Sequence, residues 1–415
     1  MKEDSVFDSF RFPVSWKSEK LRRVFDNRKT LTDIELPLLG ANIALGVTER
    51  FEGDGRPAAS EDLSKYKVVD PGDIIMNPLG KPHGSIGRSN VRGITSPAYW
   101  VLRCNEPYES RYAHYLLRSE VMINEFKRRS KNLPPNQFDL PWEQFRDFEF
   151  HFPPLEEQRR IADYLDAQVL LIDQLVELKE RANEAYAEAF ASLKHARVTG
   201  ADQENLVVTG LSWLPKAPGA WRKVSLQSQV TWRKGIDSGR LNAEYCGRHE
   251  GIYPVYSGQT ANDGVFAQID TYDFDFAQEC LLMSTVGAQA GRTKLIGGKF
   301  SLSQNCAILM AQTSDVSLRY LNFLWPSIWS VMSSEIPSDM QPSVRFSDLA
   351  KQWLVLPSLD EQIGIVKVIS KAQENSDSLV SSARSQIDKL RELKNSLISA
   401  ALTGTFDVST GRNVA

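Results

Sequence analysis

Two stretches of the chain repeat apolar residues at alternating steps of three and four, which is the seam pattern of a long helix that packs on a partner helix. The apolar seam positions are 165, 169, 172, 176, 186, 190 and 193 in the first stretch, and 365, 369, 380, 383, 387, 390 and 397 in the second. Polar residues interrupt the seams at Lys179, Asn183, Gln373 and Ser376. We expect each stretch to form one helix of about 42 residues, which at about 1.5 Å per residue is roughly 60 Å long.

The two predicted helices begin with the same motif. Residues 153–163 read PPLEEQRRIAD and residues 357–367 read PSLDEQIGIVK, at an offset of 204 residues. Two interpretations are open: each helix packs on its own domain, or the two helices pack on each other. Their unusual length and matched register favour the second interpretation.

The ends of both helices carry capping signals. Ser358 and Glu361 form a capping box, whereas the first copy has Pro154 in place of the serine and relies on proline and an acidic first turn. Gly200 and Gly404 follow the last apolar positions, where a left-handed C-terminal cap is expected. The pattern therefore predicts where each helix starts and stops.

The segments in front of the helices also repeat, with offsets that drift from 204 to 208. WKSEKL at 16–21 matches WRKVSL at 221–226, and RYAHYLLRS at 111–119 matches RYLNFLWPS at 319–327. These segments are rich in glycine, proline and short β-branched or aromatic runs, which is typical of a mixed domain with short strands and long loops. We predict an α+β fold with a first globular domain at 1–152, a long helix at 153–200, a linker and second globular domain at 201–356, a second long helix at 357–404 and a tail at 405–415.

Composition narrows the class of protein. The chain has 415 residues, with 49 Lys and Arg against 52 Asp and Glu and a formal net charge of −3. No run of about 18 apolar residues is present, so no membrane-spanning helix is expected, and the start MKEDSVFDSF lacks the apolar core of a signal peptide. The four cysteines lie far apart without a C-x-x-C pair, which is typical of a reducing cytoplasm and argues against disulfides or a structural zinc site.

The negative charge is concentrated in one segment. Residues 151–205 hold 6 basic and 11 acidic residues, whereas residues 1–150 and 206–356 each carry a net charge of +1. Basic residues of the globules cluster beside glycine or amide residues in four loops, at 80–93, 127–138, 231–235 and 289–299. Each loop taken alone is most simply a solvated surface loop. Four of them in two matched globules favour an anionic polymer as partner, because Lys and Arg reach phosphates and Arg, Asn and Gln recognise base edges.

The candidate DNA-contacting residues come from these loops and from nearby positions rich in Ser, Asn and Gln. For His83, Asn305 and Ser343 a structural role, such as a turn cap, is an equally good interpretation. In the first globule the candidates are Lys81, His83, Arg88, Asn90, Arg92, Lys131, Asn132, Asn136 and Gln137. In the second globule they are Arg233, Lys234, Ser257, Gln259, Arg292, Lys294, Gln304, Asn305, Gln341 and Ser343.

Catalytic motifs are missing from the sequence. It contains no P-loop, no Rossmann glycine motif, no G-x-S-x-G, no H-E-x-x-H and no paired nuclease carboxylates. Cys246 and His249 form a C-x-x-H without a second pair, so we interpret them as structural or surface residues. We predict no catalytic residue, no metal site and no cofactor in this chain.

The order of these features resembles the specificity (S) subunit of type I restriction–modification systems over essentially the whole chain. The resemblance rests on the two helix starts at Pro153–Ile161 and Pro357–Ile365 and on the Thr-Gly helix ends. GITSPAY at 93–99 resembles a segment of that family's first globule. In the second globule YPVYSGQ, STVGAQAGR and KFSLSQN, at 253–259, 284–292 and 299–305, resemble stretches of its target-recognition domains.

The resemblance implies a fold and a division of labour. The two globules would be target-recognition domains, and the long helices would pack antiparallel as a coiled-coil spacer with pseudo-twofold symmetry. Each globule would recognise one half of a bipartite DNA site, and spacer length would set the half-site distance. The globules differ in nearly every loop residue, so an asymmetric site is expected. In this family two modification subunits with S-adenosylmethionine methylate a flipped adenine, and restriction subunits that use ATP and Mg cleave DNA in phage defence.

Two other classes of function remain open. One is a self-contained DNA methyltransferase or nuclease with diverged motifs. The other is a coiled-coil scaffold with two protein-binding globules. Under the resemblance, the acidic face of the first helix has two equally good interpretations, a surface that binds partner subunits or a plain solvated face.

Overall fold

The computed structural model describes residues 11–32, 35–42, 46–50, 62–80, 85–133, 137–259, 261–337 and 339–413. Contacts divide the chain into two compact units. Unit 1 comprises Met1–Glu180 and Arg384–Ala415, and unit 2 comprises Arg181–Ala383. Each unit therefore contains one globule and a part of both long helices. The domain boundaries expected from the sequence follow helix ends instead, and they stay a prediction.

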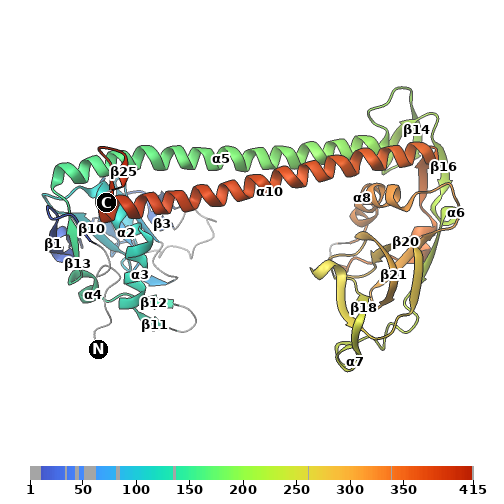
Figure 1. Cartoon of the computed structure of the whole chain (residues 1–415), viewed down its shortest axis with the longest axis horizontal. Helices are drawn as coiled ribbons and strands as arrows, with labels where there is room; N and C mark the ends of the chain where they lie inside the picture. The colour runs from blue at the N-terminus through green and yellow to red at the C-terminus, as the bar shows by residue number, and fades with distance from the viewer. Residues whose placement is uncertain are drawn as a thin grey trace. The chain divides into compact units, whose positions relative to one another are not determined.

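The two long helices are α5, Leu155–Thr199, and α10, Leu359–Thr403, each of 45 residues (Figure 1). At the start of α10 the Ser358 hydroxyl accepts a hydrogen bond from the Glu361 N–H at 3.3 Å, which is one of the two bonds of the predicted capping box, while the Glu361 carboxylate accepts from Trp221. Gly200 and Gly404 follow the two helices with φ of 67° and 73°, in the left-handed region that favours glycine. The predicted helices and both glycine caps are confirmed.

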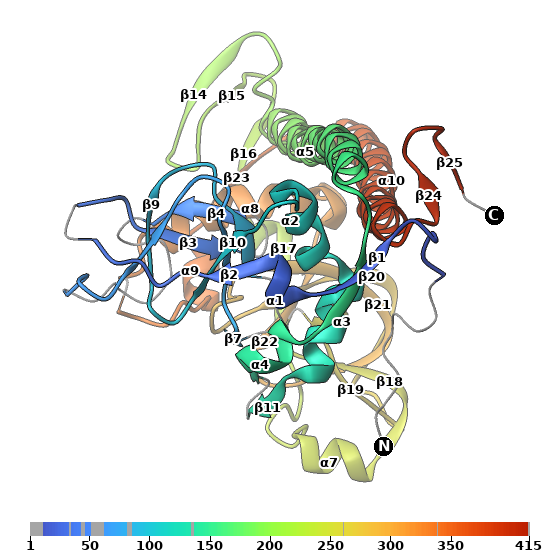
Figure 2. The same ribbon diagram turned by 90° about the vertical axis from the view of Figure 1, so that its left-hand side faces the viewer.

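Within each unit the two helices lie side by side and run antiparallel. In unit 1, Lys394 pairs with Asp173 at 2.7 Å and Arg391 with Glu180 at 2.9 Å, and Figure 2 shows the helix pair end-on. In unit 2, Val198 of α5 shares one apolar cluster with Ile365 and Ile369 of α10. The two interpretations from the sequence, packing on a globule and packing on the partner helix, are therefore both correct, because each helix does both.

The predicted seam is wrong at one position. The tyrosine side chain at 186 is 42% exposed, whereas Leu165 and Ile172 of the same seam are 0% and 6% exposed. The seam positions before Tyr186 are the polar residues Lys179 and Asn183. Apolar contacts between the helices are therefore interrupted in this region, and they do not hold Tyr186 in the seam.

The globule of unit 1 is a set of small sheets whose described residues form one large apolar cluster and two smaller ones. A four-stranded sheet has the order β2-β10-β6-β8, a three-stranded sheet has the order β11-β12-β7, and β1 pairs with β13, β3 with β4 and β5 with β9. The strands are β1 Lys17–Lys20, β2 Phe25–Asn27, β3 Leu39–Asn42, β4 Gly46–Glu49, β5 Lys67–Val69, β6 Ile74–Met76, β7 Leu79–Gly80, β8 Ile86–Arg88, β9 Gly93–Thr95, β10 Trp100–Cys104, β11 Lys131–Leu133, β12 Gln137–Asp139 and β13 Glu149–Phe152. The helices are α1 Leu21–Val24, α2 Ser110–Arg118, α3 Glu120–Arg129 and α4 Trp142–Arg146, and the tail after α10 pairs β24 Phe406–Asp407 with β25 Arg412–Asn413.

The globule of unit 2 is built on one larger sheet of six strands in the order β17-β22-β20-β21-β18-β19. Two further pairs, β14 with β15 and β16 with β23, flank it. The strands are β14 Leu206–Leu211, β15 Leu214–Pro218, β16 Arg222–Ser225, β17 Val230–Lys234, β18 Glu250–Tyr256, β19 Val265–Ile269, β20 Phe274–Ser284, β21 Thr293–Leu302, β22 Cys306–Ala311 and β23 Trp353–Leu356. The helices are α6 Leu226–Gln229, α7 Ala243–Arg248, α8 Leu318–Ser334 and α9 Phe346–Ala350, with a 3₁₀ turn η2 at Ala261–Gly264. Among the described residues, no helix combines the length and apolar character needed to cross a membrane.

A buried glutamine ties the start of each long helix to its globule. In unit 1 the Gln158 side chain is 2% exposed; its amide oxygen accepts from the Glu109 N–H at 2.9 Å and its amide nitrogen donates to the Pro153 carbonyl at 2.9 Å. Glu109 is the N-cap of α2, so this one amide joins the first turns of two helices. Both polar ends of the amide are satisfied, as burial requires.

Unit 2 contains the same arrangement. The fully buried Gln362 accepts from the Ser317 N–H at 2.8 Å, and Ser317 is the N-cap of α8. Its amide nitrogen donates to the carbonyls of Asp315 and Pro357 at 2.9 and 3.0 Å. The glutamine of the repeated EQ motif therefore has a structural task in both copies.

The glutamate of the same motif binds a tryptophan that also contacts the other helix. The indole N–H of Trp16 donates to Glu157 at 3.2 Å, and that of Trp221 donates to Glu361 at 3.1 Å. A Cβ atom on Gly404 would lie 2.5 Å from Pro13 and 3.3 Å from Trp16. In unit 2 a Cβ atom on Gly200 meets Pro218 and Trp221 in the same way. Each globule thus holds the start of one long helix and the end of the other.

Strand β8, at the edge of the four-stranded sheet, packs on α2 through a partly buried histidine. The Nδ1 atom of His114 accepts a hydrogen bond from the Arg88 N–H of β8 at 3.2 Å. Burial, together with the nearby charges of Arg118 and Arg88, lowers the pKa of His114 to about 3. The imidazole is therefore neutral in the folded protein at physiological pH.

Replacing the buried glutamine should destabilise the fold. We expect Gln158→Ala to lower the free energy of unfolding by about 1–3 kcal/mol, because the Glu109 N–H and the Pro153 carbonyl lose their partner in a buried setting. Urea unfolding followed by circular dichroism measures this change. The exposed Gln174→Ala in the same helix is the matched control and should change the free energy by less than about 0.5 kcal/mol. Equal effects of the two variants would contradict the structural task of Gln158.

The partly buried histidine predicts an acid-sensitive stability. Between pH 6.5 and pH 3 the unfolded chain binds a proton at His114 that the folded chain does not bind, so the free energy of unfolding falls as pH drops, by at most about 1.4 kcal/mol per pH unit. His114→Asn keeps an acceptor for the Arg88 N–H and removes this titration. We expect the loss of stability between pH 7 and pH 5 to be smaller in this variant, as measured by urea midpoints. The exposed His195→Asn should behave like the parent protein, and an unchanged pH dependence in His114→Asn would refute the assignment.

Candidate nucleic-acid interface

Unit 2 contains a polar hollow of about 330 Å³ at one end of its six-stranded sheet. It brings together two pairs of predicted DNA-contacting residues from distant parts of the sequence, Ser257 with Gln259 and Gln304 with Asn305. We call it the polar hollow. Its other lining residues are Ser238, Gly239, Leu241, Asn242, Gly258, Phe266, Val286 and Ser303.

Three loops meet tightly to form the polar hollow. The Ser284 hydroxyl donates to the Gly258 carbonyl at 3.0 Å, and the Thr285 N–H donates to the Asn305 carbonyl at 2.8 Å. A Cβ atom on Gly258 would lie 2.8 Å from the Asn305 carbonyl oxygen, so only glycine allows this approach. Asn305 itself has a φ of 66°, in the left-handed region. The turn between β21 and β22 is therefore fixed to the end of β20 and to the loop after β18.

Two cations lie next to this turn. Arg233 and Lys234 are exposed at the end of β17, where they are opposite Ile308 and Ala307 of β22. No hydrogen bond or ion pair of either side chain occurs within the part of the chain that the structure describes. Two uncompensated positive charges beside a polar hollow are suited to bind the phosphates that flank a recognised base.

The remaining predicted residues of unit 2 are less closely associated with the polar hollow. Lys294 donates to the Asp263 carbonyl at 3.1 Å and pairs with its carboxylate at 3.4 Å. Ser343 forms a β-bridge with Val286 of the hollow, and the side chain of Gln341 reaches the position where Gly287 would carry a Cβ. Arg292 lines a different hollow of about 470 Å³, with Phe190 and Lys194 of α5 and Trp329 of α8.

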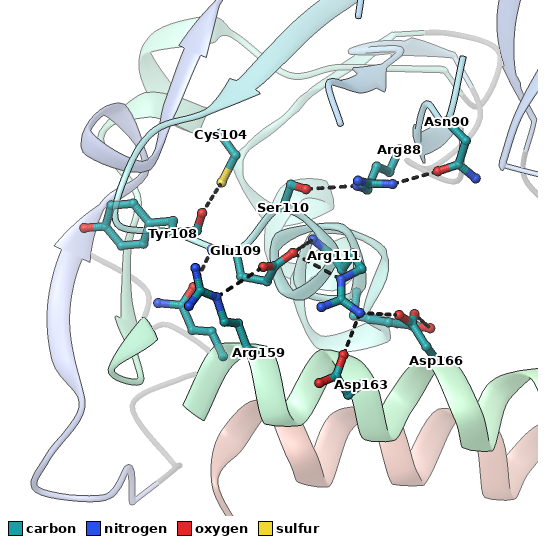
Figure 3. A network of polar contacts seen from close by, with 12 residues as sticks. Arg88, Asn90, Cys104, Tyr108, Glu109, Ser110, Arg111, Arg159, Asp163 and Asp166 are labelled. Carbon is teal, nitrogen blue, oxygen red and sulfur yellow. Dashed lines mark hydrogen bonds and ion pairs between the residues drawn. The ribbon is translucent and has the colours of Figure 1, made fainter. Parts of the chain in front are cut away.

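In unit 1 two of the predicted cations, Arg88 and Arg92, are engaged within the protein. Arg88 donates to Ser110 at 2.9 Å and to Asn90 at 2.7 Å, as Figure 3 shows, and Arg92 pairs with Asp70 at 3.3 Å. Arg88 and Asn90 therefore satisfy each other in this structure. If either residue contacts DNA, the hydrogen bond between Arg88 and Asn90 must break, or the same side chain must bond to DNA in addition.

The second basic loop of unit 1 forms a small sheet with the first. Strand β12 pairs with β11 and β7, and Phe138 lies opposite Gly80. Lys131 is exposed there. Of the other predicted residues, Lys81, His83 and Asn136 lie outside the described residues, as do the side chains of Asn132 and Gln137.

Sequence reasoning missed several residues of these surfaces. Phe266, Val286 and Ser238 line the polar hollow but stand outside the predicted set. Phe266 and Val286 are 39% and 36% exposed, which is high for apolar residues that follow strand patterns. Their signal in the sequence is weak, because an exposed apolar residue on a strand has the same pattern as a buried one. Among the described residues, no group of three or more His, Cys, Asp or Glu side chains is arranged to hold a metal ion.

Comparison with known proteins agrees with this architecture. Residues 235–387 match the family model described as the type I restriction modification DNA specificity domain. A putative type I restriction enzyme specificity subunit from Methanocaldococcus jannaschii is 22% identical over 84% of this chain and 82% of its own length. A putative type I specificity subunit from Mycoplasma pneumoniae is 31% identical over 35% of this chain, and the match spans only 39% of that relative.

Two solved structures have a similar fold. The first, described as "Structural basis underlying complex assembly and conformational transition of the type I R-M system", superposes with a TM-score of 0.70 at 18% identity over 95% of this chain and 99% of the other. The second, the crystal structure of the HsdS subunit from Thermoanaerobacter tengcongensis, has a TM-score of 0.56 at 20% identity over 95% and 98% of the two chains. The fold expected from the sequence, α+β with two mixed globules and two long antiparallel helices, is thereby confirmed. Over residues 235–387 the chain carries the type I restriction modification DNA specificity domain.

Proposed function

We propose that this chain is the DNA sequence-recognition subunit of a type I restriction–modification complex, in which each globule recognises one half of a bipartite site. The observation that carries the proposal is the polar hollow of unit 2. Its side chains are amides, hydroxyls and apolar groups, which suit base edges, and Arg233 and Lys234 beside it carry free positive charge. The match to the type I DNA specificity domain, residues 235–387, covers the lining of the polar hollow.

The two halves of the site should differ in sequence. The attachments of the globules to the long helices are the same in both units, whereas the exposed polar surfaces are not. In unit 2 Arg233 and Lys234 are free of partners among the described residues, and in unit 1 Arg88 and Arg92 are held by Asn90 and Asp70. Different surfaces on a repeated scaffold favour an asymmetric target.

The long helices are suited to set the distance between the half-sites. Both are continuous over 45 residues, and no proline lies inside either of them. Ion pairs and apolar contacts hold them together in each unit. A stiff element of fixed length between two DNA-contacting modules acts as a ruler, as dimer geometry does in other DNA-binding proteins.

The chemistry would come from partner subunits. We propose that this chain is not catalytic by itself, that two modification subunits supply S-adenosylmethionine-dependent adenine methylation, and that restriction subunits supply ATP- and Mg-dependent cleavage. The absence of catalytic motifs from the sequence supports this division. All four cysteines carry free thiols, which supports a reducing cytoplasm as the location.

The acidic face of α5 has a partly internal explanation. Arg111 of α2 pairs with Asp163 at 2.7 Å and with Asp166 at 3.0 Å (Figure 3), and Tyr115 donates to Asp166 at 2.7 Å. These carboxylates attach α2 to α5. Glu184 and Glu188 are exposed on the same helix and are the better candidates for a surface that binds a modification subunit.

Selection of DNA from a random duplex pool tests the proposal. The full chain, assembled with its modification subunits, should enrich one asymmetric sequence with two conserved half-sites separated by a fixed gap. Binding of S-adenosylmethionine by the isolated chain would instead support a self-contained methyltransferase. No sequence preference, with or without modification subunits, would support the scaffold.

A heptad insertion tests the ruler. Inserting seven residues after Glu180 in α5 and seven before Gln386 in α10 keeps the hydrogen bond between Lys179 and Gln386 and the ion pair between Glu180 and Arg391. It lengthens the helix pair by about 10 Å. We expect the gap in the selected sequence to grow by about 3 base pairs, at about 3.4 Å per base pair, with both half-sites unchanged. The same seven residues inserted at Ser409, in the turn between β24 and β25, serve as control and should leave the gap unchanged. A gap that stays the same in the double insertion would refute the ruler.

A further inference from the structure

The polar hollow of unit 2 carries no charged side chain in its lining. Its hydrogen-bonding side chains are amides and hydroxyls, from Asn242, Gln259, Gln304, Asn305 and three serines. Recognition of guanine in the major groove typically uses Arg or Lys on O6 and N7, and recognition of cytosine uses a carboxylate on N4. Neither chemistry is available inside this hollow. Amide side chains are the groups that pair bidentately with N6 and N7 of adenine.

Two of the four amides are free to make such a pair. The Asn242 side chain caps α7 by accepting from the Tyr245 N–H at 2.9 Å, and the Gln259 amide nitrogen donates to the Val265 carbonyl at 3.0 Å. The side chains of Gln304 and Asn305 are exposed, and neither makes a hydrogen bond within the described residues. They occupy successive positions of the turn between β21 and β22.

The turn that presents these two amides is held in place from both sides. The Asn305 carbonyl accepts from the Thr285 N–H at 2.8 Å, and the preceding Ser303 N–H donates to the Tyr256 carbonyl at 2.8 Å. The positive φ of Asn305 is uncommon for a residue other than glycine. Because the backbone of the turn is already fixed, only the two amide side chains lose freedom on binding, which favours discrimination between base edges.

Apolar groups complete the lining. Phe266 and Val286 border the polar hollow with 39% and 36% of their surface exposed. Apolar side chains in the major groove contact the C5-methyl group of thymine, which only the A·T pair carries. The same hollow therefore offers one type of group for each base of an A·T pair.

We propose that the polar hollow recognises an A·T base pair of its half-site, with the amide of Gln304 or Asn305 on adenine and with Phe266 and Val286 beside the thymine methyl group. Arg233 and Lys234 bind the phosphates next to this pair. This inference rests on the proposed function and makes it more specific, because it assigns a base pair to named residues. It also predicts that Arg233 and Lys234 determine how tightly DNA is bound, whereas the amides determine which base pair is preferred.

The variant Asn305→Gly isolates the amide. Glycine adopts a φ of 66° without strain, so the turn keeps its conformation while the hydrogen-bonding group is lost. With the full chain and its modification subunits, DNA selection followed by competition binding should show discrimination at one A·T pair falling by about 5- to 150-fold. The other half-site should be unaffected. Gln304→Ala, at an exposed turn position, is the second variant and should weaken discrimination at the same or the adjacent pair.

Asn205→Gly is the matched control. Asn205 also has a positive φ, 56°, and is exposed in the turn between α5 and β14, outside the polar hollow. This variant should leave the selected sequence unchanged. The double variant Arg233→Ala and Lys234→Ala should weaken binding to all sequences alike and reduce its salt dependence.

The outcomes separate this inference from the proposed function. If the parent complex selects no sequence, the proposed function fails. If the parent complex selects a bipartite sequence but Asn305→Gly and Gln304→Ala both leave every base preference unchanged, only this inference fails. A preference lost at a G·C pair would also overturn it, because the lining would then recognise a different base edge.

Discussion

One buried amide at the start of each long helix fixes how the helix leaves its globule. Gln158 and Gln362 each join the first turn of a long helix to the N-cap of a shorter one, and both ends of the amide are satisfied. A side chain that serves two backbones in a buried setting allows little choice of angle or register. The same attachment also includes the end of the other long helix. Trp16 and Trp221 bond to Glu157 and Glu361 at the helix starts, and both tryptophans also lie close to the glycine that ends the other helix, Gly404 or Gly200.

This constraint separates what the sequence could predict from what it could not. The helices, their caps and the repeat were predictable because they depend on contacts between near neighbours, such as Ser358 with Glu361. The task of Gln158 was not, because its partner Glu109 lies far away in the sequence. The same holds for the site. Asn305 was a candidate from the sequence, but only the folded structure brings it beside Ser257 and Gln259. Arg88 was also a candidate, and the sequence did not show that its side chain is hydrogen-bonded to Asn90.

The two units use one scaffold for different surfaces. In unit 1 Arg111 is paired with carboxylates and Arg88 is hydrogen-bonded to neutral side chains, whereas Arg233 and Lys234 of unit 2 have no partner among the described residues. The attachments repeated in both units lie at the ends of the long helices, whereas the polar groups that differ between the units lie elsewhere, such as Arg88 on β8 and Arg233 on β17. The exposed surface can therefore differ without a change in the attachments. The local net charge, more than the total of −3, therefore governs which surface attracts an anionic polymer.

The attachment of Trp16 near Gly404 also has a consequence for the order in which the chain folds during synthesis. Unit 2 is a continuous segment, Arg181–Ala383, and holds both halves of its own attachment, so it can close before translation ends. Unit 1 combines the first part of the chain with the last. The contacts of Trp16 and Pro13 with Gly404 can form only after Gly404 has been synthesised. Domains usually mature from the N-terminus onward. Here the globule made first is the last to be completed, which leaves its apolar helix face uncovered until the ribosome has almost finished.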